Sequence, residues 1–377
     1  MKVAIVHEYL VQYGGAERVL EAIKEIYPEA PVYTLMYDPE QMPSKYKSWT
    51  IYTPSSLRHK ILHKHYKKLF MIYPVFMESF DLKEFDLVIS SSYAYAHGVL
   101  TFPGACHVCY CHTPMRFGWV NPEGYRNTIP WWQKNLYDFF IKKLKRWDLS
   151  ASKRPDYYIA ASDEVKNRID QFYKRSAKVI YPPVNVEFFR NDTVPTRENY
   201  YLLVSRLVHP YKKIDIAIQA FNEMKKRLII IGDGSDKEYY QKIAGPTIEF
   251  YRKSDDSQLK EFYSRARALV FPSHDDFGIV PLEANATGCP VIAWKRGGIL
   301  ETQIEDKTAV FYPDASAESL IDAVKKFEQM TFNHSEIVDN ASRFSKTIFQ
   351  EALKQFIEKN INTRTIHNEC SQGCPHA

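Results

Sequence analysis

Two acidic side chains in the later half of the chain, Asp275 and Glu283, have a spacing that suits ligand binding. The apolar run Ala268–Phe271 predicts a buried strand just before Asp275, and a helical pattern follows that carries Glu283. The first N–H groups of that helix, over Gly278–Leu282, lack partners within it and can bind a phosphate. Two carboxylates beside an anion-binding helix start indicate a ligand with both hydroxyls and phosphate, such as a nucleotide sugar.

Two cations, Arg206 and Lys212, follow another predicted strand, Tyr201–Val204. In an open parallel sheet, ligands bind at the carboxyl ends of the strands. Arginine offers phosphate a planar fork and lysine offers a compact charge, so the pair can clamp a diphosphate. The turn Gly232–Gly234 also follows a strand and lets the backbone approach a ligand, although the full dinucleotide fingerprint is missing. The absence of a Walker lysine and of a nucleophile-elbow serine counts against an ATPase or an esterase.

A glycine pair, Gly14–Gly15, lies in the earlier half between a predicted strand and a helical pattern that begins near Val19. Such a pair brings the backbone close to a ligand at the positive end of a helix. By itself it is a weak signal, because many glycine pairs only form tight turns.

Short strands alternate with helices along the whole chain, which predicts an α/β protein with two doubly wound, mostly parallel sheets. The strands expected in the first half are Lys2–Val6, Pro31–Thr34, Asp86–Ser90, Ala105–Cys111, Pro155–Ala160 and Lys178–Tyr181. Those expected in the second half are Tyr201–Val204, Arg227–Ile231, Thr247–Phe250, Ala268–Phe271, Val291–Ala293 and Ala309–Phe311. The pattern breaks near Tyr181 and resumes at Tyr200, so we expect domains at 1–188 and 189–345, a helix at 346–360 that returns to the first domain, and a tail at 361–377.

Composition limits the class of protein. The 377 residues are 45% apolar and 25% charged, as in a soluble protein with more than one core. The net charge of +5 is mild, so nucleic acid is not an expected partner. The longest apolar run, Leu69–Met77, is far shorter than the roughly 20 residues of a membrane span. Because the N-terminus does not resemble a signal peptide, we expect a cytoplasmic protein with reduced thiols.

Cysteine and histidine residues gather in two places. The segment Cys106–His112 resembles a metal cluster, but we favour a buried strand in which Cys109 and Cys111 act as small apolar side chains. Near the C-terminus, Cys370 and Cys374 are flanked by histidines, and their spacing fits no standard zinc pattern. A frayed terminus is the favoured interpretation there.

Two basic amphipathic stretches, Leu57–Phe70 and Lys134–Trp147, lie in the first half. In the second one, Leu136, Phe140, Leu144 and Trp147 form the expected apolar stripe. Each stretch can pack inward and leave its lysines in water. Together, and with Trp131, Trp132 and Tyr137 nearby, they favour an anionic membrane surface as a partner. We therefore expect a peripheral protein on the inner face of the cytoplasmic membrane.

The candidate site residues, taken together, resemble those of the retaining glycosyltransferases of family 4, whose two-domain fold is GT-B. The resemblance covers nearly the whole chain and rests on Gly14–Gly15, His112, Arg206, Lys212, Gly232–Gly234, Asp275–Glu283 and Gly297–Glu301. Its most specific part is the pair of acids separated by seven residues. Two further stretches, His7–Arg18 and His112–Arg116, are similar to bacterial mannosyltransferases of polysaccharide and O-antigen assembly.

The resemblance implies a role for each matched residue. Arg206 and Lys212 would hold the diphosphate, Glu283 the ribose hydroxyls, and Asp275 and His112 the transferred sugar. The implied catalytic set is Asp275, His112, Arg206 and Lys212. The implied donor-binding set is Gly14, Gly15, Arg206, Lys212, Gly232, Tyr251, Arg252, Gly278, Ile279, Val280 and Glu283. The chain departs from the family at Asp275, where glutamate is usual, and at Tyr251–Arg252, near the base, where a glycine is usual.

The implied reaction moves mannose from GDP-mannose to a lipid-linked glycan with retention of configuration. Fixed cations and helix N–H groups would stabilise the charge that develops on the leaving diphosphate, so no metal and no cofactor are expected. One alternative is a nucleotide-sugar epimerase of the same fold, with His97 and Glu8 as acid and base. The other is a non-catalytic protein that binds glycans or lipids.

Overall fold

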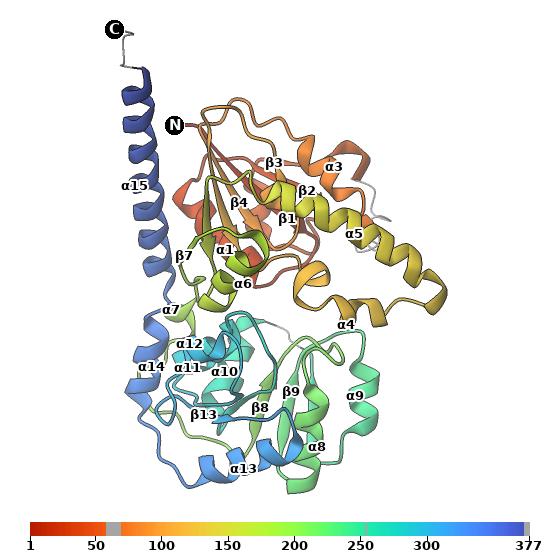
Figure 1. The fold of residues 1–377 in the computed structure, drawn as a ribbon. Coiled ribbons are helices and arrows are strands. Elements are labelled where there is room, and N and C mark those ends of the chain that lie inside the picture. Colours follow the sequence, from red (N-terminus) through yellow and green to blue (C-terminus); the bar gives the residue numbers. More distant parts are fainter. Residues whose placement is uncertain (58–68, 253–254, 373–377) are drawn as a thin grey trace. The chain divides into compact units, whose positions relative to one another are not determined.

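The computed structural model describes residues 1–57, 69–252 and 255–372, with side chains up to Ile361. It divides into two compact units (Figure 1). Unit 1 comprises Met1–Tyr181 and Phe349–Ala377, and unit 2 comprises Pro182–Ile348. Each unit is built around one parallel sheet with helices on its faces, which confirms the predicted class.

The sheet of unit 1 has seven parallel strands in the order β3-β2-β1-β4-β5-β6-β7. The strands are β1 (Val3–Leu10), β2 (Val32–Tyr37), β3 (Ile51–Tyr52), β4 (Leu87–Ser92), β5 (Cys106–Cys111), β6 (Tyr157–Ala160) and β7 (Ala177–Val179). All the predicted strands are present, and β3 was missed because two residues carry no periodicity. The strand order reverses between β1 and β4, where open α/β sheets bind their ligands.

β1 is longer than predicted, because it continues through His7 and Glu8 to Leu10. These two polar residues are buried completely, and each has hydrogen-bond partners. The register sets His7 directly beside Ser91 of β4. The polarity of His7 and Glu8 therefore gave the wrong end for this strand, because polarity does not reveal whether a side chain has hydrogen-bond partners in the core.

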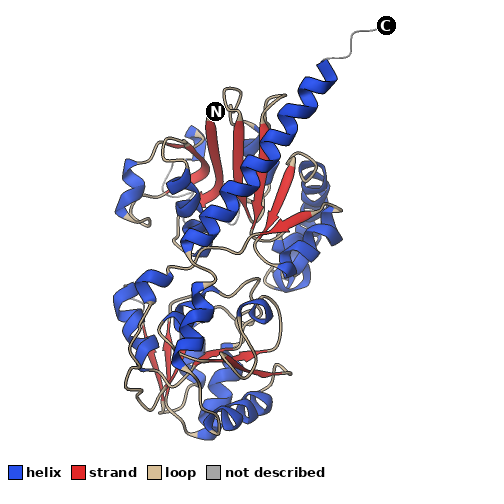
Figure 2. Cartoon of the chain, turned by 90° about the vertical axis from the view of Figure 1, so that its left-hand side faces the viewer, coloured by secondary structure: helices blue, strands red, loops and turns tan. Residues whose placement is uncertain are grey.

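Helices cover both faces of this sheet (Figure 2). They are α1 (Gly15–Ile26), α3 (Tyr73–Glu78), α4 (Pro122–Asn127), α5 (Lys134–Ala151), α6 (Asp163–Tyr173) and α15 (Lys346–Gln372), with the shorter turns η1 (Ser44–Ser48), η2 (Ser55–Leu57), η4 (Ala96–Gly98), η5 (Arg116–Val120) and η6 (Trp131–Gln133). The last helix, α15, packs Phe349, Leu353 and Ile357 into the core of unit 1. Its apolar residues at a spacing of four place them on one side of the helix.

The sheet of unit 2 has six parallel strands in the order β10-β9-β8-β11-β12-β13. They are β8 (Tyr201–Val204), β9 (Leu228–Ile231), β10 (Ile248–Tyr251), β11 (Leu269–Phe271), β12 (Val291–Trp294) and β13 (Ala309–Tyr312). β9 is entirely apolar and fully buried, as expected for a strand covered on both faces. Here the order reverses between β8 and β11, so the loops after these two strands begin side by side.

The helices of unit 2 alternate with these strands, as the sequence pattern predicted. They are α7 (Val186–Phe189), α8 (Ile214–Met224), α9 (Lys237–Ile243), α10 (Asp256–Arg265), α11 (Ile279–Ala286), α12 (Ile299–Thr302), α13 (Ala317–Glu328) and α14 (His334–Ser342). The core on one side of the sheet includes the buried residues Ile214, Ile218 and Phe221 of α8 and Leu320 and Val324 of α13. This packing fixes the sheet edge that carries the candidate site.

Candidate active site

An ion pair joins the two loops at the strand-order reversal of unit 2. Lys212 lies in the loop after β8 and Asp275 in the loop after β11. The Nζ of Lys212 is 2.7 Å from Oδ1 and 2.8 Å from Oδ2 of Asp275. The side chains keep 12% and 25% of their surface exposed, so a ligand can reach both. The structure thus brings together two residues that the sequence placed in separate motifs.

Arg206 lies in the same loop as Lys212, and its side chain is exposed. Two glycines of the β9–α9 turn allow this loop to pack closely. A Cβ on Gly232 would be 1.9 Å from the carbonyl oxygen of Ser205, and one on Gly234 would be 2.3 Å from that of Leu207. Gly232 and Gly234 therefore support the loop that carries Arg206.

The start of α11 carries the backbone N–H groups that were expected to bind an anion. Gly278 precedes the helix with a φ of 97°, a conformation that favours glycine. The N–H groups of Ile279 and Val280 come first in the helix, where no intrahelical partner exists. Pro281 has no N–H group, so Ile279 and Val280 are the donors that the first turn directs outward.

A second glycine pair fixes the loop of Asp275 from behind. The N–H of Gly298 donates to the carbonyl of Asp275 at 3.0 Å. A Cβ on Gly298 would be 2.3 Å from the carbonyl oxygen of Asp276, and one on Gly297 would be 2.3 Å from the ring of His274. The Gly297–Gly298 turn, which the resemblance included without a role, thus positions the acid loop.

Glu283 lies in α11, one turn after the helix start, as predicted. Its carboxylate is nearly buried, with 3% of the residue exposed, and its Oε2 accepts a hydrogen bond from the hydroxyl of Tyr263 at 3.2 Å. Tyr263 lies in α10 and was not selected from the sequence. The helical pattern of α10 predicts that Tyr263 faces inward, but it does not predict a hydrogen bond to a carboxylate on another helix.

The residues expected near the base, Tyr251 and Arg252, lie at the carboxyl end of β10. The carbonyl of Tyr251 accepts the N–H of Gly232 at 3.0 Å, and the Tyr251 hydroxyl donates to Glu249 at 2.9 Å. Arg252 is 81% exposed, and its Nε lies 3.5 Å from Asp233. These residues are on the same sheet edge as Lys212, two strands along.

Three of the predicted site residues belong to unit 1. Gly14 and Gly15 lie at the start of α1, directly after β1, and His112 follows β5. The Nε2 of His112 lies 2.8 Å from the Oγ of Ser91. Burial lowers the pKa of His112 to about 3, so its ring is neutral at physiological pH. All three residues lie at the carboxyl edge of their own sheet.

The acid and base named for the epimerase alternative are both engaged. Glu8 is completely buried, and its carboxylate accepts the N–H groups of residues 93–96 and the hydroxyl of Ser92. A carboxylate bound by so many donors is a structural acceptor. Glu8 therefore caps the turn after β4 and has no room for a sugar carbon.

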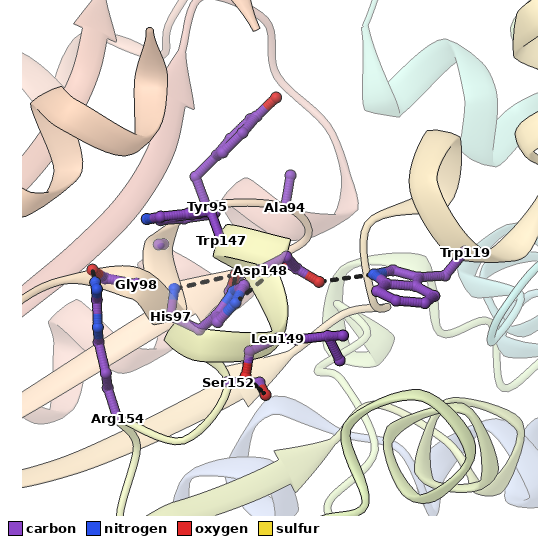
Figure 3. Close-up of polar contacts among 12 residues, drawn as sticks. Ala94, Tyr95, His97, Gly98, Trp119, Trp147, Asp148, Leu149, Ser152 and Arg154 are labelled. Atoms are coloured by element: carbon purple, nitrogen blue, oxygen red, sulfur yellow. Dashed lines mark hydrogen bonds and ion pairs between the residues drawn. The ribbon is translucent and has the colours of Figure 1, made fainter. Parts of the chain in front are cut away.

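His97 pairs with a buried acid on α5. Figure 3 shows Asp148 between His97 and Trp119: His97 Nε2 is 3.2 Å from Oδ1, and the Trp119 indole N–H donates to Oδ2 at 2.7 Å. His97 and Asp148 are 3% and 0% exposed. Arg154, at the end of the same segment, donates to the carbonyl of Gly98. These contacts fix α5 and the segment after it to the turns η4 and η5. The epimerase alternative has no observation in its favour.

The predicted basic helix is α5, but its inward face differs from the predicted stripe. Ile141, Leu144 and Asp148 are buried, whereas Leu136 is 57% exposed. The stripe was wrong at Leu136 because the first turns of α5 extend past the body of the unit (Figure 1). Exposed apolar side chains gather around this end of the helix with basic residues close by in the chain. This aromatic-basic surface comprises Tyr125, Trp131, Trp132, Leu136, Phe139, Lys142, Lys143 and Arg146.

The other predicted basic stretch and the C-terminal tail fall largely on residues that the structure does not describe. Within Leu57–Phe70, residues 58–68 lie outside the described residues, as does Cys374 with the side chain of Cys370. Among the helices that the structure describes, none has the length and apolarity needed to cross a bilayer.

The cysteine-rich segment is a strand of the core. Cys106, Cys109 and Cys111 are buried residues of β5. Burial raises the pKa of the Cys109 thiol. His107, in the same strand, bonds the Oγ of Ser90 at 2.8 Å. In the described parts of the chain, no three His, Cys, Asp or Glu side chains are grouped so that they could hold a metal ion.

Comparison with known proteins assigns the family. Residues 13–188 match the model described as Glycosyltransferase Family 4, and residues 185–344 match the model of Glycosyl transferases group 1. The chain belongs to glycosyltransferase family 4. The two models meet close to the border between the two units of this family 4 glycosyltransferase.

Several curated relatives are similar over part or most of this glycosyltransferase. An uncharacterized glycosyltransferase of Methanocaldococcus jannaschii is 28% identical over 217 residues, 55% of this chain and 60% of that protein. Alpha-1,3/1,6-mannosyltransferase ALG2 of Candida glabrata is 24% identical over 97% of this chain and 94% of its own length. The O-antigen chain mannosyltransferase RfbU of Salmonella typhimurium is 29% identical over 50% of this chain and 59% of its own.

Solved structures support the fold. The Anabaena protein HepE, in complex with UDP, matches with a TM-score of 0.70 at 16% identity, and covers 95% of this chain and 100% of its own. With the family assignment, this confirms that the two sheets are those of a GT-B glycosyltransferase.

Proposed function

We propose that this glycosyltransferase moves mannose from GDP-mannose to a lipid-linked glycan, with retention of anomeric configuration and without a metal ion. The observation that carries the proposal is the ion pair of Lys212 with Asp275 at the strand-order reversal of unit 2, in the loop that also carries Arg206. The choice of mannose is supported by the names of two relatives, ALG2 and RfbU, which are both mannosyltransferases.

The pair suits a reaction in which negative charge moves onto a diphosphate. The bond between the anomeric carbon and the phosphate oxygen breaks, and its electron pair goes to the leaving diphosphate. A hydroxyl oxygen of the acceptor forms the new bond to the anomeric carbon, and its proton passes to the oxygen of the leaving diphosphate. Lys212 and Arg206 stabilise the diphosphate charge, and the N–H groups of Ile279 and Val280 add fixed dipoles. Asp275 stabilises positive charge on the sugar ring.

Metal independence follows from the same cations. Lys212 is held next to the leaving group by Asp275, and its charge costs no reorganisation when the bond breaks. Arg206 supplies a second positive charge, because its guanidinium group stays protonated at any physiological pH. These two side chains supply the charge that a divalent metal ion supplies in other transferases.

The lipid-linked acceptor calls for a membrane surface. We assign it to the aromatic-basic surface at the start of α5, where Trp131 is 84% exposed and Trp132 66% exposed. Indole rings favour the headgroup region of a bilayer, and Lys142 and Lys143 favour anionic lipids. The protein would then lie on the inner face of the cytoplasmic membrane, where nucleotide sugars and lipid-linked glycans meet.

A donor panel tests the proposal. Thermal shift and transfer to a lipid-linked glycan should be measured with GDP-mannose and with matched UDP- and ADP-sugars, each with and without EDTA. We expect GDP-mannose to give the largest shift and the highest rate, with no loss in EDTA. Preference for another nucleotide would overturn the donor assignment. Loss of activity in EDTA that is restored by Mg²⁺ would overturn metal independence.

A further inference from the structure

Three consecutive serines at the end of β4 each bond a histidine. The pairs are Ser90 with His107 at 2.8 Å, Ser91 with His112 at 2.8 Å and Ser92 with His97 at 3.2 Å. Ser91 differs from its neighbours, because its Oγ also lies 3.1 Å from Nδ1 of His7. A single hydroxyl thus connects a buried imidazole to the imidazole of His112.

The connection continues from His7 to an acid. Nε2 of His7 lies 3.4 Å from Oε1 of Glu17, in the first turn of α1. His7 and Ser91 are completely buried, and Glu17 is 3% exposed. Glu17, His7, Ser91 and His112 therefore form a continuous buried relay that ends at the one partly exposed member, His112.

Hydrogen-bond donors and acceptors fix the direction of this relay. A carboxylate only accepts hydrogen bonds, so Nε2–H of His7 donates to Glu17. The separation of 3.4 Å is long for a charge-assisted bond, which is about 2.7–2.9 Å, and this favours a neutral His7. Nδ1 of a neutral His7 is then an acceptor, and it accepts a hydrogen bond from the hydroxyl of Ser91.

The same assignment of donors and acceptors fixes the tautomer of His112. Because the only hydroxyl proton of Ser91 is used in the hydrogen bond to His7, its oxygen must accept a hydrogen bond from Nε2–H of His112. His112 then carries its proton on Nε2 and a lone pair on Nδ1. The low pKa of His112, about 3, keeps the second nitrogen unprotonated at physiological pH. A ring fixed in this way can accept a hydrogen bond at Nδ1 and cannot donate one there.

We propose that Glu17, His7 and Ser91 are positioning residues that hold His112 as the Nε2–H tautomer, so that its Nδ1 accepts a hydrogen bond from a hydroxyl of the transferred sugar. The contact of His112 with the sugar rests on the proposed function, whereas the relay itself rests on distances and burial within unit 1. A sugar hydroxyl is the matching group, because it can donate a proton to Nδ1.

Nitrogen-15 NMR of the imidazoles in the full-length protein tests the relay without any assay of activity. We expect His112 to show a protonated Nε2 and an unprotonated Nδ1. Ser91→Ala should convert the His112 signals to those of mixed tautomers, whereas Ser90→Ala, the matched control on the same strand, should change His107 and leave His112 as it was. A proton on Nδ1 of His112 in the wild-type protein would overturn the relay.

Kinetics test the positioning role. Ser91→Ala should lower kcat/KM with GDP-mannose about tenfold, as for the loss of one hydrogen bond, while Ser90→Ala keeps it. Thermal melts of both variants show whether the folds match. Full activity of a well-folded Ser91→Ala variant would overturn the role. If Lys212→Ala stays active while Ser91→Ala fails, the proposed donor site is wrong and the relay stands.

Discussion

The ammonium of Lys212 bridges both carboxylate oxygens of Asp275, at 2.7 and 2.8 Å, across 63 positions of the chain. The two residues meet because β8 and β11 are parallel neighbours whose carboxyl ends lie at one edge of the sheet. A diphosphate at this edge would share the ammonium with Asp275. The pair therefore couples the charge of the leaving group to the acid beside the sugar.

Removing the cation should abolish most of the catalysis. We expect Lys212→Ala to lower kcat/KM by about 100- to 1,000-fold, the size found when one preorganised charge-stabilising group is lost. Asp275→Asn in the same background should add little, because the two side chains act as one unit. Initial rates over a range of donor concentrations measure both effects.

A matched control uses another ion pair of unit 2. Lys226 lies 2.7 Å from Glu328, as close as Lys212 to Asp275, but away from the loops of the site. Lys226→Ala should retain wild-type activity. Equal rates for Lys212→Ala and Lys226→Ala would remove Lys212 from the mechanism.

The buried acid of α11 should affect donor binding more than stability. We expect Glu283→Gln to raise the KM for the donor by roughly 10- to 100-fold, because a charged acceptor for hydroxyl groups is lost. Tyr263→Phe removes only the hydroxyl that bonds Oε2 at 3.2 Å and should change KM much less. If both variants lose stability alike and bind the donor normally, Glu283 is a structural residue.

Gly232 should tolerate no side chain. Its Cβ would lie 1.9 Å from the carbonyl oxygen of Ser205, so Gly232→Ala should displace the loop that carries Arg206 and raise the donor KM. Gly104→Ala is the control, because that glycine has a φ of 109° and no atom within 4 Å of the added Cβ. Urea unfolding should show strain of about 1 kcal/mol for Gly104→Ala and a larger loss for Gly232→Ala. A normal KM in Gly232→Ala would contradict the role of this turn.

Stability should fall in acid because of a buried histidine. Burial lowers the pKa of His107 to about 3 from an ordinary value of 6.5. Between these pH values the unfolded chain binds a proton that the folded chain does not. The free energy of unfolding is therefore complete above pH 6.5 and declines as the pH falls, by about 1.4 kcal/mol per pH unit for one histidine.

His107→Gln isolates this effect, since glutamine does not titrate. Urea unfolding at pH 5, 6 and 7.5 should give a weaker pH dependence in the variant than in the wild-type protein. The expected difference between pH 6 and pH 5 is about 1.4 kcal/mol. His112 contributes in the same direction in both proteins. Identical slopes would show that His107 is protonated in the folded state.

Membrane binding should need both the tryptophans and the lysines of the aromatic-basic surface. Trp131→Ser with Trp132→Ser should weaken co-sedimentation with all vesicles, and Lys142→Glu with Lys143→Glu should remove the preference for anionic ones. Salt should weaken wild-type binding to anionic vesicles. Lys325→Glu, an exposed charge reversal in unit 2, is the control. Binding that ignores salt and lipid charge would exclude this surface.

Local pattern determined much of this protein. Apolar runs between turn residues located most strands of the second sheet, because a strand buried on both faces needs an unbroken apolar run such as Leu228–Ile231. The residues that follow those runs, Arg206, Lys212 and Asp275, were predicted as site residues because parallel strands direct their carboxyl ends to one edge. Leu136 was misplaced because a helical stripe does not reveal where the neighbouring surface ends.

Only the tertiary structure decided which of these groups meet. The strand order reverses between β8 and β11 and between β1 and β4, and that order set Lys212 against Asp275 and Ser91 against His7. Glu8, named in the sequence analysis for the epimerase alternative, proved to be the buried acceptor of a turn. Periodicity reports which face of an element is apolar, but a hydrogen bond between distant residues depends on the position of two backbones in space, which no single stretch of sequence contains.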